Sequence, residues 1–472
     1  MGTWTGDTLG TVQEMMNEKK TELVEGFKYQ FPILNRVSKV VRKEAYNGKY
    51  VIVPMHVSGG MNASPRGETD NVVTPLPDTF IEERIQLSEI MGSIGLTQDE
   101  MDYAVKSGGS AVGNLIDIKK NGALQDAKYK LNLFFAGDGT GKLARIASVT
   151  THDASSATYV AGNTYADSGI PGTSRLKVGM LVDIYTVAGI GATDAWTIKV
   201  SGARVTSVAN ATTFSVAYSS HVDVAANDFV FIHNSVNVGS DTYLAGYKGS
   251  NGLWDIVNSN TTTGTTLAHE YASADNYNGS CRGATFQNVT RATYPQLNAL
   301  IRTAAEWASG TKGTATTCDL SVINDTIRMI DEEGGASGLG GGQVTAIYMN
   351  GKTRDWMARL AKVDGNAFVN VDSGKIVPGL YIESYRTSTG RIIPIIPMNT
   401  LPDGVIMLGD ERDLMLFEPE SIDWYRGING QLLFPVPGAR NLTFEAWVRW
   451  KGMLAARRCD NWARIEDIDV TQ

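Results

Sequence analysis

The residues whose types and spacing come nearest to a chemical motif are FFAGDGTGKLA, at 134–144. A phosphate-binding loop has the pattern Gly-x-x-x-x-Gly-Lys-Ser/Thr between a buried strand and a helix, and its backbone N–H groups surround the phosphates. Here Gly141-Lys142 would close the motif, but Ala136 replaces the first glycine and Leu143 replaces the magnesium-binding hydroxyl residue. The preceding residues also have helical rather than strand character. We therefore expect these glycines to end a helix, where positive φ is needed.

The other residue types that support catalysis show no catalytic or metal-binding spacing. No His-Glu-x-x-His pattern is present among the five histidines, which are His56, His152, His221, His233 and His269. Three distant cysteines fit neither a zinc site nor a disulfide framework. We expect inert thiols in a reducing compartment at Cys281, Cys318 and Cys459. The sequence therefore predicts no catalytic residue, no cofactor, no metal and no enzyme activity.

Length and composition indicate an ordered protein of several domains. A chain of 472 residues is long enough for roughly two to four domains. The net charge of -8 argues against sequence-specific nucleic-acid binding as the main role, because that role needs a basic patch. The start, MGTWTGDTLG, lacks the features of a secretory signal, and no apolar run is long enough to span a bilayer. We expect no membrane association.

The first segment, residues 1–48, has the character of an arm. Between positions 19 and 49 basic residues clearly outnumber acidic ones. Such a bias fits either a solvated face or a segment that meets something anionic. Our candidates for assembly contacts in this arm are Lys39, Arg42 and Lys43.

Residues 49–96 predict a long hairpin. KYVIVPMHV is extended by residue type, SGGMNASPRGETD is a turn-forming tip, and the chain returns through NVVTPLPDTFIEERIQLSEI. A long, largely independent hairpin is not stable alone in water, so it predicts a partner surface. At the tip, Arg66 and Glu68 are candidates for charge contacts between subunits, with simple solvation as the alternative.

The next segments predict a long helix followed by an inserted β domain. Residues 97–149 begin with a capping box, Thr97 with Glu100, and continue with apolar residues at three-and-four spacing. Residues 150–248 contain short strands separated by turns, which indicates a barrel or a sandwich. The Asn-, Thr- and Gly-rich segment 249–290 is expected to be an irregular connection back to the core.

The C-terminal third mixes helical and strand patterns. In 291–415, TYPQLNALIRTAAEWA and CDLSVINDTIRMIDEEGG are expected to be helices, and QVTAIYMN, RIIPIIP and GVIMLGD are expected to be strands. In 416–472, the alternation in NLTFEAWVRW predicts a half-buried strand.

This order of elements resembles the major capsid proteins of tailed bacteriophages, which have the Hong Kong 97-type capsid fold. The stretches that carry the resemblance are GKYVIVPMHVSGGMNASPRGETD, FIEERIQLSEIMGSIGLTQDEM, DAKYKLNLFFAGDGTGKLA, GLYIESYRTSTGRIIPIIPMNTLPDGVIMLGD and AARRCDNWARIEDI. The resemblance implies an α+β fold with an inserted all-β domain at 150–248. Its other parts would be the N-terminal arm (1–48), the extended loop hairpin (49–96), the spine helix and peripheral domain (97–149), the axial domain (291–415), and the peripheral domain sheet with the C-terminus (416–472).

The resemblance implies a virion protein that forms pentamers and hexamers, which tile an icosahedral head around double-stranded DNA. The hairpin would lie over a neighbouring subunit and the arm beneath one. Candidate partners are further copies of the chain, a separate scaffolding protein, a portal, a decoration protein and weakly held DNA, with assembly in the host cytoplasm. Some members cross-link through a lysine in the extended loop, but the tip from Ser58 to Asp70 has no lysine. We therefore expect no such cross-link.

Two other classes remain as alternatives. An encapsulin-like shell or another phage structural protein is one of them. An encapsulin has the same fold, and what fills the particle, DNA or a cargo enzyme, separates it from a virion. The other is a carbohydrate-active enzyme with a β module at 150–248 and tryptophans such as Trp447, Trp450 and Trp462 as a sugar platform. It predicts paired acidic residues in a cleft.

Overall fold

The structure is a computed structural model with an α+β architecture. It describes residues 33, 36–40, 50–58, 79–100, 110–137, 139–153, 155–162, 172–188, 195–219, 223–226, 228–235, 249–259, 285–287, 289–310, 314–338, 342–363, 383–398, 400–427, 430–436 and 443–471. Within these residues, no helix is long and apolar enough to cross a membrane.

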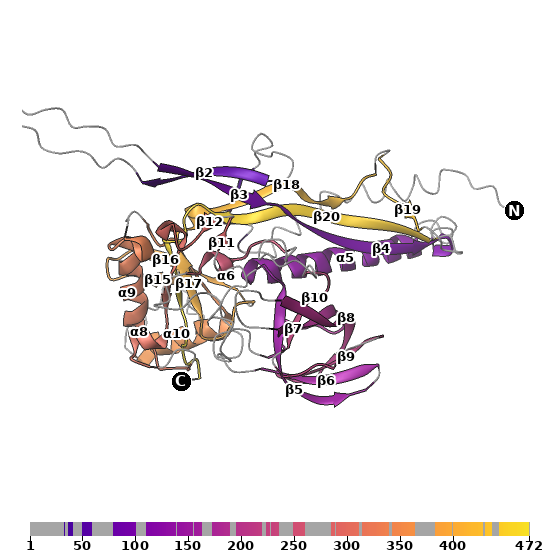
Figure 1. Cartoon of the computed structure of the whole chain (residues 1–472), viewed down its shortest axis with the longest axis horizontal. Helices are drawn as coiled ribbons and strands as arrows, with labels where there is room; N and C mark the ends of the chain where they lie inside the picture. Colours follow the sequence, from indigo (N-terminus) through magenta and orange to yellow (C-terminus); the bar gives the residue numbers. More distant parts are fainter. Residues whose placement is uncertain are drawn as a thin grey trace, which may run out of the picture.

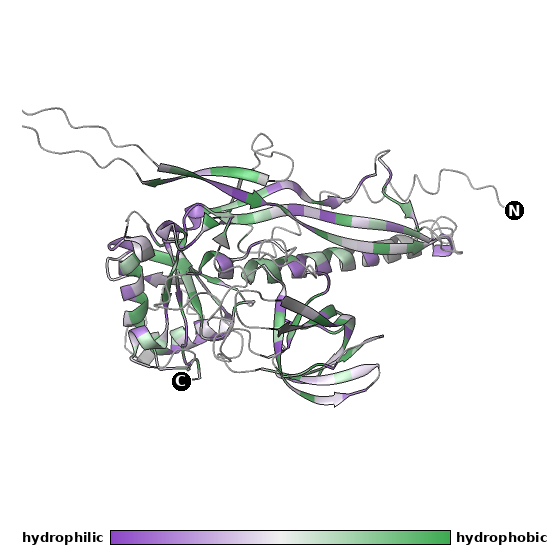
Figure 2. Ribbon diagram, viewed as in Figure 1, coloured by the Kyte–Doolittle hydropathy of each residue, from purple (hydrophilic) through white to green (hydrophobic). Residues whose placement is uncertain are grey.

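A long sheet forms the spine of the molecule together with one helix. Its strands are β1 (Ser38–Val40), β18 (Leu414–Trp424), β20 (Thr443–Ala456) and β19 (Phe434–Pro435), with β4 (Ser88–Thr97) also paired to β20. Along β20, Phe444, Ala446, Val448 and Trp450 are buried and the residues between them are half-buried, as the alternation predicted. Figure 2 shows this alternation as changing colours along β4 and β20.

The long helix α5 (Ser110–Ala136) packs on the buried face of the long sheet. Gly92 of β4 allows the two backbones to approach closely, because a Cβ there would already lie 3.4 Å from the carbonyl oxygen of Ala123. Lys119 fixes the helix to the end of β4 by bonding Gly95 O at 3.0 Å and Glu100 at 2.7 Å. In Figure 1 the helix runs along the sheet. The helix predicted from three-and-four spacing is thus confirmed over this range.

The hairpin consists of β2 (Tyr50–Ser58) and β3 (Thr79–Gln86), which pair antiparallel with Val51 opposite Ile85 and His56 opposite Phe80. It lies over the end of the long sheet (Figure 1). The predicted tip between these strands lies outside the described residues.

A closed barrel hangs from the end of α5, on the side away from the long sheet (Figure 1). Its strands, in the order β10-β5-β6-β9-β8-β7, are β10 (Phe229–Ile232), β5 (Lys142–His152), β6 (Ser156–Ala161), β9 (Thr213–Ala217), β8 (Ala195–Val208) and β7 (Leu181–Ala188). The first strand begins at Lys142, eight residues before the expected boundary at 150. Leu143, Ala144 and Ile146 are fully buried in the barrel core, so residues assigned to the helix-ending loop belong to a strand.

A six-stranded sheet forms the third body. Its order is β13 (Leu300–Arg302), β21 (Trp462–Ile465), β17 (Ile406–Gly409), β14 (Ala346–Met349), β16 (Ile392–Pro397) and β15 (Ser384–Arg386). The helices that accompany it are α8 (Ala304–Trp307), α9 (Leu320–Asp331) and α10 (Gly351–Val363). Asp319 caps α9 by accepting the N–H of Ser321 at 2.8 Å.

Two expectations about this body were wrong. The helix expected over TYPQLNALIRTAAEWA is a 3-10 turn (Pro295–Leu297), strand β13 and the single turn α8, because β13 pairs in parallel with the distant strand β21. The assignment of 416–472 implied that the last strand, β21, would lie in the long sheet. It lies in the six-stranded sheet instead. All four of its residues are buried, which a sheet interior requires.

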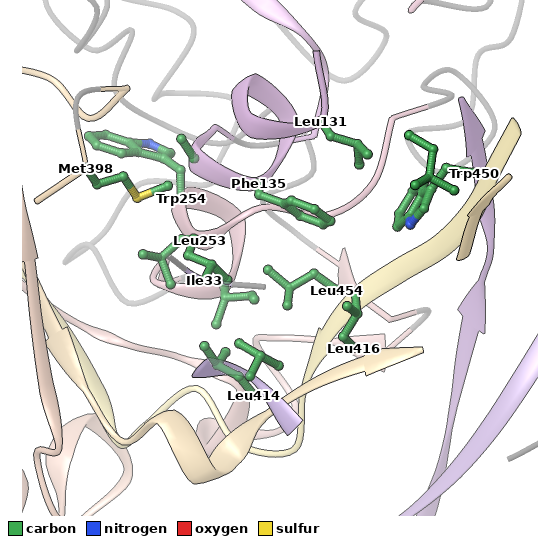
Figure 3. Close-up of a cluster of buried hydrophobic side chains, with 14 of the residues drawn as sticks. Ile33, Leu131, Phe135, Leu253, Trp254, Met398, Leu414, Leu416, Trp450 and Leu454 are labelled. Carbon is green, nitrogen blue, oxygen red and sulfur yellow. The ribbon is translucent and has the colours of Figure 1, made fainter. Parts of the chain in front are cut away.

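The main core joins these bodies. Its side chains come from α5, the long sheet, the six-stranded sheet and the short helix α6 (Leu253–Ile256), and Figure 3 shows ten of them by name: Ile33, Leu131, Phe135, Leu253, Trp254, Met398, Leu414, Leu416, Trp450 and Leu454. Phe135 and Trp450 meet edge to face with ring centroids 5.8 Å apart.

Candidate assembly surfaces

The glycine-rich run after α5 has no phosphate-loop geometry. The helix ends at Ala136, and the N–H of Gly137 donates to Leu133 O at 3.0 Å. Gly139 and Gly141 follow with φ of 80° and 79°, conformations that glycine adopts without strain. The chain then enters a strand, so no helix N-terminus is present to hold an anion. The expectation that these glycines end a helix is confirmed in part: Gly137 directly follows the helix, but the positive φ values belong to Gly139 and Gly141 in the connection to β5.

The segment that contains these glycines packs against a second glycine-containing segment, 249–252. A Cβ at Gly249 would lie 2.1 Å from Gly139 O, and a Cβ at Gly252 would lie 2.1 Å from both Gly137 O and Phe134 O. The N–H of Trp254 also donates to Gly137 O at 3.1 Å. The two connections that lead into and out of the barrel therefore touch backbone to backbone. We call this contact the glycine crossing.

Arg175 fastens the barrel to the rest of the molecule. This buried side chain donates from Nε and Nη2 to Thr400 O, at 3.1 and 2.6 Å, across to the loop between β16 and β17. The hydroxyl of Tyr129 on α5 donates to Arg175 O at 3.0 Å, and Lys177 Nζ lies 3.5 Å from the Tyr129 ring centroid. Barrel, helix and six-stranded sheet thus meet at one polar junction.

The hairpin has two different faces. Its outer face carries Ile52, Pro54 and His56 on β2 opposite Arg84, Glu82 and Phe80 on β3, all of them exposed. Phe80 is 64% exposed and stacks only partly on His56, with ring centroids 4.9 Å apart. A strand pair with exposed apolar side chains on its outer face is a candidate contact surface.

The inner face of the hairpin rests on the long sheet. The cluster there comprises Val51, Ile85, Met415, Phe417, Met453 and Ala455, with Val53 and Leu87 partly buried beside it. Two polar bonds add to it: Arg84 N donates to Gln287 O at 3.0 Å, and Gln296 Nε2 donates to Val57 O at 2.8 Å. Glu83 also points to this face and is fully buried.

The exposed face of the long sheet carries a charge network beside an aromatic cluster. Arg449 Nε lies 2.9 Å from Glu89 and 3.4 Å from Glu420, and its guanidinium lies 5.5 Å from the Tyr425 ring centroid. The half-buried aromatic cluster, with centroids 4.6 to 6.1 Å apart, is Tyr425, Phe434 and Trp447. Trp450 and Trp462 are buried in cores, so the three tryptophans considered as a sugar platform do not share a surface.

The described N-terminal residues 33 and 36–40 are tied to the body by an ion pair that sequence reasoning missed. Arg36 grips Glu411 with two bonds, Nε to Oε1 at 2.6 Å and Nη2 to Oε2 at 2.8 Å. The buried hydroxyl of Tyr348 donates to the same carboxylate, and burial together with that carboxylate raises the pKa of Tyr348. Residues 36 and 411 are too far apart in the chain for any local pattern to pair them.

Of the predicted contact residues, only Lys39 falls within the described backbone. It lies in β1, in parallel register with Leu416 of β18. Arg42, Lys43, Arg66 and Glu68 lie outside the described residues, so the structure does not test them. They remain predictions.

The two described cysteines and His233 have structural surroundings that account for them. Cys318 and Cys459 are buried free thiols, and burial raises the pKa of Cys318 to about 12 and that of Cys459 further. His233 Nδ1 lies 2.7 Å from the buried Asp183, which also accepts the N–H of Asn234. In the described ranges no group of three or more His, Cys, Asp or Glu side chains could hold a metal ion.

Comparison with known proteins finds similarity only at the level of solved structures. No family model and no curated protein matches the chain. The chain is similar to a protein of the cyanophage A-1(L) capsid asymmetric unit, with 14% identity, coverage of 92% of this chain and 90% of that one, and a TM-score of 0.45. It is also similar to the capsid of a native GTA particle (10% identity, 92% and 90% coverage, TM-score 0.42) and to a structure from Gordonia phage Cozz (9%, 92% and 85%, 0.40). These similarities are distant.

Proposed function

We propose that the chain is the major capsid protein of a tailed bacteriophage, with the Hong Kong 97-type fold. Copies would form pentamers and hexamers of an icosahedral head around double-stranded DNA, in the virion. In this assignment the hairpin is the extended loop, α5 the spine helix, the long sheet the peripheral domain and the six-stranded sheet the axial domain. The barrel is an insertion.

One observation carries the proposal: the hairpin lies on the long sheet with apolar side chains exposed on its outer face. An isolated strand pair is marginally stable, and its exposed apolar residues gain from a covering surface. Phe80 and Ile52 flank the charged residues Arg84 and Glu82, so the covering surface would need both apolar and charged groups. The exposed face of the long sheet has both kinds of group, around Met91 and in the Arg449 network. A second copy of the chain therefore supplies a suitable partner.

Shell formation also suits the electrostatics. Individual exposed charge contacts contribute only about 0–1 kcal/mol, but a closed shell repeats each of them many times. A net charge of -8 limits attraction to DNA phosphates, which fits a wall that encloses DNA without binding it tightly.

The test is electron microscopy of the purified chain after size-exclusion chromatography, with two matched variants. Phe80→Ser and Val178→Ser each remove an apolar side chain of almost equal exposure, 64% and 65%, from the hairpin and from the barrel. We expect closed shells, tubes or rings of five or six from the wild type and from Val178→Ser, and dispersed subunits from Phe80→Ser. A wild type that stays monomeric, or a Phe80→Ser variant that assembles normally, would contradict the proposal.

The contents of particles made in the native host separate the two kinds of shell. A virion protein encloses DNA that resists added nuclease, whereas an encapsulin-like shell encloses a cargo protein. We expect nuclease-protected DNA.

A further inference from the structure

Glu83 has an ionisable side chain at the interface between the hairpin and the body. It lies between Ile81 and Ile85 on the inner face, its Cα stands opposite Val53, and its side chain is fully buried. Among the described residues, neither carboxyl oxygen has a hydrogen-bond partner. An apolar residue would fill this position without the free-energy penalty of burying a carboxylate.

None of the described groups around Glu83 pairs with its carboxylate. From β18 and β20 the hairpin's inner face meets Met415, Phe417, Met453 and Ala455, which are apolar. The neighbours Glu82 and Arg84 on its own strand point to the exposed outer face.

A titratable group from another segment that interacts with Glu83 is the buried thiol of Cys459. The electrostatic neighbours of that thiol are Glu83, Arg291, Asp460 and Asp255. Arg291 donates to backbone oxygens, including Asn258 O at 2.9 Å, and its Nη2 lies 3.8 Å from the carboxylate of Asp255, while its buried Nε has no hydrogen-bond partner among the described residues. Gln287, which contacts the hairpin through its backbone, keeps its own side-chain oxygen buried without a partner.

We propose that Glu83 is a proton-operated latch that holds the base of the hairpin on the long sheet. With its proton the carboxyl packs as a neutral group among apolar side chains. Without the proton it carries a buried, unpaired charge that is relieved when the hairpin lifts into water. The latch is a property of the single subunit, and only its consequence, a pH-dependent reach of the hairpin toward a neighbour, rests on the proposed function.

The pH window follows from the two states. Burial raises the pKa of Glu83 from 4.5 to about 8 in the closed hairpin, whereas a lifted hairpin returns the carboxyl to water and to its ordinary pKa. Between these values the closed state keeps a proton that the lifted state releases. Lifting therefore becomes about tenfold easier for each pH unit of increase, and the effect levels off near pH 8.

The test is amide hydrogen exchange of the full-length chain, kept as single subunits, with peptides that report β2 and β3 between pH 5 and 9. Wild type and Glu83→Gln are compared at each pH, so that the chemical exchange rate cancels. We expect protection of the hairpin in the wild type to fall relative to Glu83→Gln by about tenfold per pH unit up to about pH 8. Peptides from α9 should keep a constant ratio.

Two further variants keep the test decisive. Glu82→Gln changes the exposed neighbour on the same strand and should follow the wild type at every pH. Glu83→Met removes the titratable group while keeping an unbranched side chain, and it replaces Glu83→Gln if that variant does not fold. A ratio that is constant between pH 5 and 8, or one that changes equally in α9, overturns the proposal. Because the readout comes from single subunits, a failure of assembly leaves this result unaffected.

Discussion

The glycine crossing makes a prediction that needs no knowledge of function. Gly252→Ala adds one methyl group where two backbone oxygens already stand 2.1 Å from its position, more than an ångström inside an ordinary contact. The backbone angles at Gly252, φ -124° and ψ 175°, suit any residue, so the effect is purely one of space. The connection must move away from the end of α5.

The expected cost has two parts. Overpacking a well-filled site destabilises by about 1–3 kcal/mol. Movement at Gly252 also stretches the bond from Trp254 N to Gly137 O, whose loss costs about 1 kcal/mol. We therefore expect the variant to be less stable by roughly 2–4 kcal/mol.

The assay is urea unfolding of single subunits, followed by tryptophan fluorescence. A loss of this size lowers the unfolding midpoint by about 1 M. The matched control is Gly122→Ala, at a solvent-exposed position away from the ends of α5, where an added Cβ meets nothing within 4 Å. That substitution should stabilise the protein by about 0.5–1 kcal/mol, because alanine favours the helix. The reasoning is refuted if both variants shift the midpoint in the same direction.

Three further predictions follow, two on contacts between distant segments and one on the buried thiols. Arg175→Lys keeps the charge but cannot donate twice to Thr400 O, so limited proteolysis should cut the barrel connections several-fold faster than in the wild type. Arg36→Ala removes the two-pronged ion pair at the base of the arm, and hydrogen exchange in β1 should accelerate while exchange in β21 stays unchanged. Cys318 and Cys459 should resist an aromatic disulfide reagent at pH 8 until urea unfolds the chain, because burial keeps both thiols protonated. Labelling is mapped by mass spectrometry, and rapid labelling of either thiol in the native protein would show the burial to be wrong.

Local sequence patterns predicted those helices and strands whose apolar residues recur with the period of a single element. The spacing of Ala127, Leu131 and Phe134 predicted α5, and the alternation from Phe444 to Trp450 predicted β20, because each pattern reports which face of a single element is buried. The capping box is also present, with Thr97 N bonded to Glu100 at 3.0 Å.

Pairings between distant residues could not be predicted in this way. Leu300 to Arg302 form a strand only because Ala463 to Ile465 lie beside them, and the helical spacing of that segment was overridden by the sheet. Likewise, Leu143 reads as part of a loop until the barrel surrounds it. The arm junction and the latch residue depend on surfaces supplied by other segments, so a single stretch of sequence carries no signal for either.

The strand order also constrains how a newly made chain matures. β4 pairs with β20, and β13 pairs with β21, so both large sheets need strands that are synthesised after the barrel. The barrel is different, since all its strands lie between Lys142 and Ile232 and can pair while synthesis continues. Incomplete chains on one messenger RNA would therefore carry a folded barrel but no finished platform beneath the hairpin.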